Sequence, residues 1–133
     1  MTVNTKRNRI RDERGQAMTE FAIVLPILVV LLFGIVQFGI LFNNYVTLTD
    51  AVRAGARAAA VSRQAPNPTG IATAAVQSSA GGLNQANLGV NINSAWTPGA
   101  TVTVTATYPY SINLLGWVVS SGDLTTKTTE AVE

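Results

Sequence analysis

The carboxylates are the residues most able to do acid–base or metal chemistry here, because the sequence has no histidine and no cysteine. That composition excludes thiolate nucleophiles, disulfides and zinc sites of the Cys/His kind. The carboxylates are scattered, and no pair has a spacing that indicates catalysis or metal binding. We therefore predict no catalytic residue, metal, cofactor or small-molecule substrate. The carboxylates are Asp12, Glu13, Glu20, Asp50, Asp123, Glu130 and Glu133.

Glu20 differs from the other carboxylates because a long apolar run follows it. From Phe21 to Phe42 no residue is charged, and these residues as a helix would span roughly 33 Å, enough for a bilayer core of about 30 Å. The run predicts a membrane span in contact with the lipid bilayer. Ionisable residues at membrane depth are functional candidates. The simpler interpretation is a headgroup-level glutamate in the first turn of the helix, where the helix dipole favours it.

Two other interpretations of the apolar run are less favoured. The rest of the chain is too small to bury such a helix inside a soluble core. A cleaved secretory signal would have a shorter apolar region of about 7–15 residues followed by a small-residue site. Here Asn43, Asn44 and Tyr45 follow the run. A single-pass anchor is the prediction that remains.

Basic residues indicate the orientation of this anchor. Five Lys and Arg residues lie in the first fifteen positions, whereas Arg53, Arg57 and Arg63 follow the run. The positive-inside rule then predicts a cytoplasmic N-terminus and an exported C-terminal domain. We expect no nucleic-acid binding, because the basic segment has no interleaved aromatic residues and the neighbouring anchor explains it.

The residues around Glu20 form a recognisable pattern. A glycine, Gly15, follows the basic leader; Glu20 lies five residues later, and the apolar run begins at once with Phe21. This resembles the class III signal of type IV prepilins, which prepilin peptidase cuts after the glycine. The pair Glu20 and Phe21 looks like the Glu-Tyr pair of the Flp pilins.

Two further segments extend the resemblance. Residues 20–26 and residues 49–60 are similar to TadE-like proteins, so the likeness covers about residues 14–63. It implies a minor pilin or pseudopilin of the Tad (Flp, type IVc) pilus system in the bacterial inner membrane. The implied role is structural, in pilus initiation and assembly, adhesion and secretion. Prepilin peptidase, other pilins or pseudopilins and inner-membrane platform proteins are the implied partners. The alternative is an uncleaved inner-membrane assembly adaptor.

The resemblance also implies roles for single residues. Cleavage between Gly15 and Gln16 would expose a new α-amino group on Gln16. The carboxylate of Glu20 would pair with that amine, on its own chain or on a neighbour. Major type IV pilins usually present Phe or Met for N-methylation where this chain has Gln16.

The apolar helix is predicted to continue beyond the membrane as a stem. Apolar and small residues recur at alternating spacings of four and three, which is typical of a helix-packing seam. The seam packs either on the chain's own domain or on a partner helix. A charged stripe of Asp50, Arg53 and Arg57 is either a solvated face or a set of helical ion pairs. The seam consists of Leu41, Tyr45, Leu48, Val52, Gly55 and Ala59.

The whole pattern predicts an α+β, pilin-like fold, in which a long N-terminal helix precedes a short helix and a small antiparallel sheet. The predicted parts are a basic cytoplasmic leader (1–15), the transmembrane helix and stem (16–63) and an exported α+β domain (64–133). The short helix is expected over 69–80 with Thr69 as its cap, and strands over 90–93, 101–108 and 124–132, with Pro109 ending the second. The apolar segment 112–119 between strands either covers the stem or presents Trp117 to a partner or to the outer face of the membrane.

Overall fold

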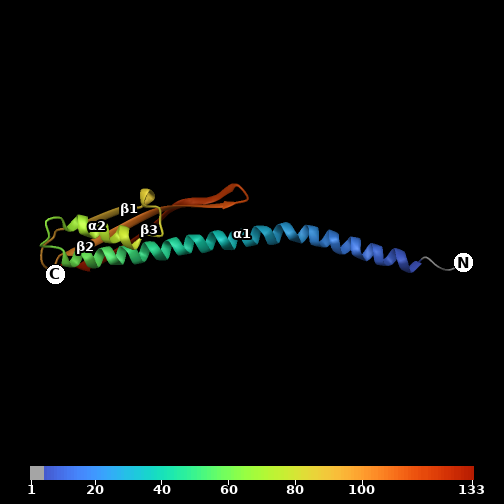
Figure 1. The fold of residues 1–133 in the computed structure, drawn as a ribbon, viewed down its shortest axis with the longest axis horizontal. Coiled ribbons are helices and arrows are strands. Elements are labelled where there is room, and N and C mark those ends of the chain that lie inside the picture. Colours follow the sequence, from blue (N-terminus) through green and yellow to red (C-terminus); the bar gives the residue numbers. More distant parts are fainter. Residues whose placement is uncertain (1–4) are drawn as a thin grey trace.

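The computed structural model describes the backbone of residues 5–133 and the side chains of residues 15–133. One long helix, α1 (Thr5–Val61), is followed by a short helix, α2 (Pro68–Ser79), and a three-stranded antiparallel sheet (Figure 1). The predicted α+β fold is confirmed. The side chains of the basic leader, Lys6 to Arg14, lie outside the described residues.

Helix α1 is 57 residues long, or about 85 Å. It includes Pro26, and it continues through Gly15 without a break. Only its C-terminal part packs on the rest of the chain, and the half toward the N-terminus projects away from it (Figure 1). The helix therefore has two different environments along one continuous element.

Helix α2 begins one residue earlier than predicted, and the predicted cap was wrong. Asn67 is the N-cap, and its side-chain oxygen accepts a hydrogen bond from the amide of Gly70 at 2.9 Å. Pro68 occupies the first helical turn, where the missing N–H of proline costs nothing. Asparagine beside a proline at this position satisfies the helix start, so Thr69 lies inside the helix.

The sheet has the order β1-β2-β3, with β1 at Gly89–Ser94, β2 at Thr101–Leu114 and β3 at Trp117–Ala131; a short 3₁₀ turn, η1 (Gln85–Asn87), precedes it. Strands β2 and β3 are longer than predicted, and Pro109 does not end β2. Strand β1 pairs with β2 only as far as Thr107, so Pro109 lies where β2 has lost one neighbour and its missing donor is tolerated.

The sequence analysis placed the apolar segment 112–119 between two strands, and this prediction was wrong. It contains the ends of β2 and β3 and the turn that joins them, with a register irregularity at Ile112 and Asn113. These residues form the far end of a hairpin that extends well beyond β1 (Figure 1). Because most residues of this segment are apolar, the sequence shows no alternation of apolar and polar residues that would indicate a strand.

The core lies between the two helices and one face of the sheet. Strand β2 contributes Val102, Val104 and Ala106, which are fully buried, as the strict alternation of this strand predicts. Helix α1 supplies mostly alanines, so the helices and sheet approach closely. The buried hydrophobic cluster is Leu48, Ala51, Val52, Ala56, Ala59, Ala72, Val76, Ala80, Leu83, Val102, Val104, Ala106 and Val132.

Candidate cleavage and membrane-anchoring site

The residues of the predicted cleavage motif form one exposed turn of α1. The hydroxyl of Thr19 donates a hydrogen bond to the carbonyl oxygen of Gly15 at 2.9 Å. The side-chain amide of Gln16 donates to Oε1 of Glu20 at 3.1 Å. Gln16 and Glu20 are thus neighbours on one face of the helix, four residues apart. Sequence reasoning had paired the main-chain nitrogen of Gln16 with Glu20 and had missed this side-chain contact.

Gly15 has no packing partner that requires a glycine. A β-carbon built at Gly15 would meet nothing within 4 Å, whereas one at Gly55 would collide with Val76. Glycine inside a helix costs about 1 kcal/mol relative to alanine. The contacts among the described residues therefore explain Gly55 but give no packing reason for Gly15, nor for Gly34 and Gly39 of the same helix.

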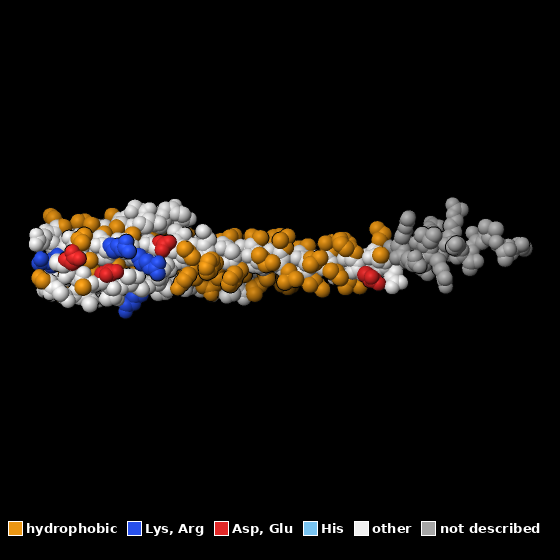
Figure 2. Space-filling view, turned by 90° about the horizontal axis from the view of Figure 1, so that it is seen from below, with side chains coloured by type: hydrophobic (Ala, Val, Ile, Leu, Met, Phe, Trp, Pro, Cys, Tyr) orange, Lys and Arg blue, Asp and Glu red, His pale blue; other side chains and the backbone are white. Residues whose placement is uncertain are grey.

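Most of the predicted membrane span is exposed. Among the described residues, one helix is long and apolar enough to cross a membrane, and none of its most apolar window is buried. Large side chains such as Leu32, Ile35 and Phe38 are more than 60% exposed. Figure 2 shows this apolar stretch between the charged head and the single carboxylate near the described N-terminal end. An unshielded apolar surface of this length is suited to lipid or to other apolar helices.

The predicted stem seam divides into two parts. Leu48, Val52, Gly55 and Ala59 are buried against α2 and the sheet, within the chain's own core. Leu41 is half-buried, and Tyr45 is 45% exposed. The interior part of the seam is therefore occupied by the chain's own domain, and the part nearer the apolar run stays partly exposed.

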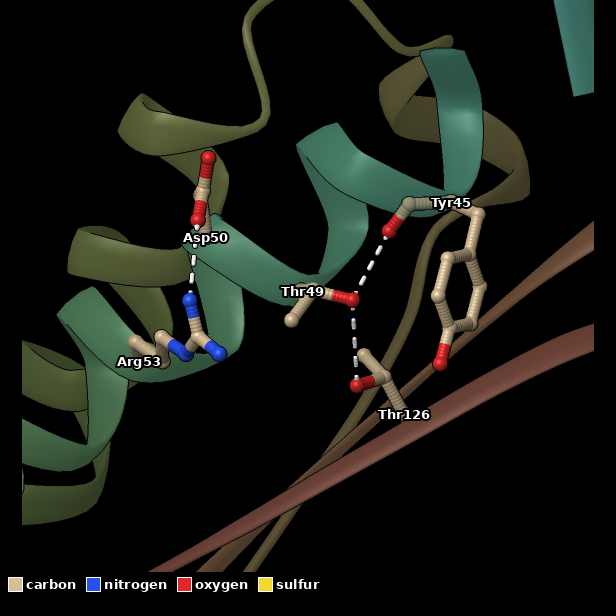
Figure 3. A network of polar contacts seen from close by, with 5 residues as sticks. All are labelled: Tyr45, Thr49, Asp50, Arg53 and Thr126. Carbon is tan, nitrogen blue, oxygen red and sulfur yellow. Dashed lines mark hydrogen bonds and ion pairs between the residues drawn. The ribbon is translucent and has the colours of Figure 1, made fainter. Parts of the chain in front are cut away.

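The stem charges lie on the solvent side of α1. Arg53 and Asp50 form an ion pair at 3.5 Å, and their side chains are 63% and 65% exposed (Figure 3). Pairs of this kind contribute about 0–1 kcal/mol. Arg57 is exposed as well. In the described chain these charges form a solvated face of the stem.

A polar link that the sequence did not indicate joins α1 to the sheet. The hydroxyls of Thr49 and Thr126 lie 3.4 Å apart, and Thr49 also donates to the carbonyl oxygen of Tyr45 at 2.8 Å (Figure 3). Thr126 is only 9% exposed, so this contact fixes β3 against the stem from within. In the sequence, the only indication of this contact was Thr49, a threonine on the side of the helix that carries the predicted seam.

Within residues 15–133, no group of three or more Asp, Glu, His or Cys side chains is placed to hold a metal ion. The same described residues contain no buried side-chain nitrogen or oxygen without a hydrogen-bond partner. The exposed segment 15–20 and the apolar run are two features that contacts within the described chain do not explain.

These features define an α+β protein whose small head is carried on a long, exposed apolar helix. Residues 15–57 match the family model described as TadE-like protein, which confirms the resemblance found in the sequence. The matched segment begins at Gly15 and contains Glu20, the apolar run and most of the stem. No curated protein matches the chain, and neither does any solved structure.

Proposed function

We propose that this protein is a minor pilin or pseudopilin of the Tad pilus system, with a structural role in pilus initiation and assembly. The observation that carries the proposal is the position of Gly15, at the start of the TadE-like segment, five residues before Glu20 and in an exposed part of the helix. The family is structural and associated with the Tad pilus, and this argues for an assembly role over catalysis. Adhesion and secretion would be properties of the assembled pilus.

In this proposal, prepilin peptidase hydrolyses the peptide bond between Gly15 and Gln16. Water adds across the bond, leaving a carboxylate on Gly15 and an amine on Gln16. The bond lies in a helical turn, so this turn has to open before a peptidase can reach the carbonyl. Glycine weakens a helix by roughly 0.5–1 kcal/mol relative to alanine, which lowers the cost of that opening.

Glu20 would then hold the new amine during assembly. Its carboxylate is exposed and already accepts a hydrogen bond from Gln16. When apolar helices leave the bilayer and pack together, a charged amine and a carboxylate become buried as a pair. Removing one partner of a buried pair typically costs about 3–5 kcal/mol. The pair would therefore select the correct register between neighbouring pilins.

The proposed location is the inner membrane, with the N-terminus in the cytoplasm and the head in the periplasm. The excess of Lys and Arg before the anchor supports this orientation. Other pilins and inner-membrane platform proteins are the proposed partners. They would contact the anchor and the anchor-proximal part of the stem, where the apolar side chains are exposed.

The second candidate is an uncleaved assembly adaptor that stays in the inner membrane. The continuous helix through Gly15 favours this reading, since the intact chain already forms a regular anchor. Intact-mass measurement of the chain co-expressed with prepilin peptidase separates the two. Loss of residues 1–15 supports the pilin, and retention of them supports the adaptor.

The same measurement has a matched control. Gly15→Val should block cutting, because a β-branched side chain crowds the scissile carbonyl. Gly34→Val makes the same change in the same helix at another glycine with nothing within 4 Å. It should be cut like the wild type. Equal cutting of both variants would contradict the assigned site.

A further inference from the structure

The far end of the β2–β3 hairpin is an exposed apolar tip, defined here as residues 114–119. Trp117 is 82% exposed, and Leu115, Val118 and Val119 are each more than 60% exposed. Nearer the core the strands alternate buried and exposed residues, but at the tip both faces are apolar. Val61 and Ile71 of the head are exposed as well, but at the tip four large apolar side chains that are close in sequence are exposed together.

The tip lies beside the membrane anchor. Leu114 lines an open apolar groove together with α1 residues between Val30 and Phe38. Closer to the head, Tyr108 to Ile112 line a second hollow with Gln37, Leu41 and Asn44. Figure 1 shows the hairpin running back along α1 toward its N-terminal half. The hairpin therefore extends past the outer end of the predicted span, to the level of residues inside it.

Both elements are uncharged where they face each other. On α1, no residue between Glu20 and Asp50 is charged. On the hairpin, the first charge is Asp123, which pairs in register with Pro109, and the residues from Pro109 to Gly122 are uncharged. Pro109 in turn lines the hollow with Asn44 of α1. The two uncharged segments are distant in sequence but lie next to each other in the fold.

The turn at the tip has an unusual residue. Leu115 and Gly116 have φ values of 52° and 91°, the left-handed region in which Asn-Gly or Asp-Gly is strongly preferred. A leucine in this turn has no favourable interaction with water, and its positive φ is conformationally disfavoured. Its presence is explained if the turn faces an apolar environment.

We propose that this tip is a second membrane contact, which enters the outer leaflet of the bilayer beside the anchor. Lipid is the occupant because one wall of the groove is the anchor helix itself. Trp117 and Tyr110 are residue types that favour the interface between headgroups and acyl chains. The proposal rests on membrane anchoring and does not depend on cleavage or on pilus assembly.

The hairpin backbone limits how deeply the tip can enter. Beyond Thr107, strand β2 has no partner other than β3, so the tip is a two-stranded ribbon with two open edges. Open sheet edges are not tolerated within the hydrocarbon layer. The tip therefore occupies the interfacial layer, so the α1 residues that share its groove, Val30 to Phe38, lie at the outer boundary of the hydrocarbon and not at its centre. The hydrocarbon-spanning part of α1 is then on the N-terminal side of this groove, and the bilayer beside the hairpin is thinned to match the shorter helix.

Tryptophan fluorescence tests this placement, because Trp117 and Trp96 are the two tryptophans of the chain. The full chain would be reconstituted in vesicles of phosphatidylethanolamine and phosphatidylglycerol, and the spectrum of Trp117→Phe subtracted from that of the wild type. Trp96 is half-buried and packs on the core, so it stays as an internal reference. The difference spectrum should be blue-shifted and quenched more strongly by a nitroxide near the headgroup than by one at the chain end.

Each other outcome overturns the placement. Quenching of Trp117 by aqueous iodide without quenching by nitroxide lipids would put the tip in water. A blue shift that ignores nitroxides and grows with the protein-to-lipid ratio would mean that a second copy covers the tip. Stronger quenching from the chain end would place the tip in the hydrocarbon. Vesicle flotation is read in parallel, and a chain that does not float would refute the anchor and the proposed location together.

Discussion

Gly55 of α1 lies so close to Val76 of α2 that no β-carbon fits between them. The carbonyl oxygen of Ala72, on the preceding turn of α2, is 3.3 Å from the same position. Gly55 is buried, and Val76 is fully buried. This contact joins the stem to the head, and it sets the distance between the two helices.

Gly55→Ala should destabilise the head. Overpacking costs about 1–3 kcal/mol, and the better helix propensity of alanine offsets about 1 kcal/mol of that. We expect a net loss of up to about 2 kcal/mol in the free energy of unfolding, measured by denaturation of the detergent-solubilised chain. Gly34→Ala, with nothing within 4 Å, is the matched control and should leave the head unchanged.

A double variant makes this prediction specific to the contact. In a Val76→Ala background the space beside Gly55 is larger, so the further change of Gly55→Ala should cost less than it does in the wild type. An equal cost in both backgrounds would show that the loss arises elsewhere.

Val132→Ala should lower the stability of the head by about 2 kcal/mol, because it removes buried apolar surface and leaves a cavity. Val132 is only 2% exposed, and its amide donates to the carbonyl oxygen of Ala100 at 2.7 Å. Val61→Ala is the same change at a residue that is 70% exposed. Its effect should stay within about 0.5 kcal/mol, and similar melting shifts for both variants would contradict the burial of Val132.

Glu20→Gln should impair assembly without affecting the single chain. The amide oxygen of the new side chain can still accept the hydrogen bond from Gln16, and a neutral group is cheaper in the membrane. We expect normal membrane levels and normal cleavage, but reduced co-purification with partner pilins. Equal recovery with partners would leave Glu20 as a headgroup-level residue. Loss of the chain itself would indicate a folding role.

The orientation can be tested at Gly82, an exposed position with nothing within 4 Å. A reporter inserted there should be active only if it is of the periplasmic kind, since the Lys and Arg excess keeps the N-terminus inside. A reporter fused before Met1 should show the opposite preference. Activity of a cytoplasmic reporter at Gly82 would reverse the topology.

The features that could be predicted from the sequence alone are the local ones. The uncharged run after Glu20 indicates an apolar helix, because in a helix the backbone N–H and C=O groups of such a run hydrogen-bond to one another. The alternation of Val102, Val104 and Ala106 predicts a strand with one buried face, since strand side chains alternate every two residues. The motif from Gly15 to Phe21 carried the family resemblance, which depends on residue types and spacing and needs no fold.

Only the tertiary structure decided which residues and elements pack against each other. Pro109 could remain inside β2 because β1 ends before it, and the sequence does not contain that pairing. Residues around the stem, such as Thr49 and Thr126, meet across 77 positions, so no local pattern links them. The placement of Leu114 beside the anchor likewise depends on the register of the whole hairpin and on its packing against α1. Sequence patterns report the face of an element that is apolar, whereas the partner of that face is set by the packing of all elements together.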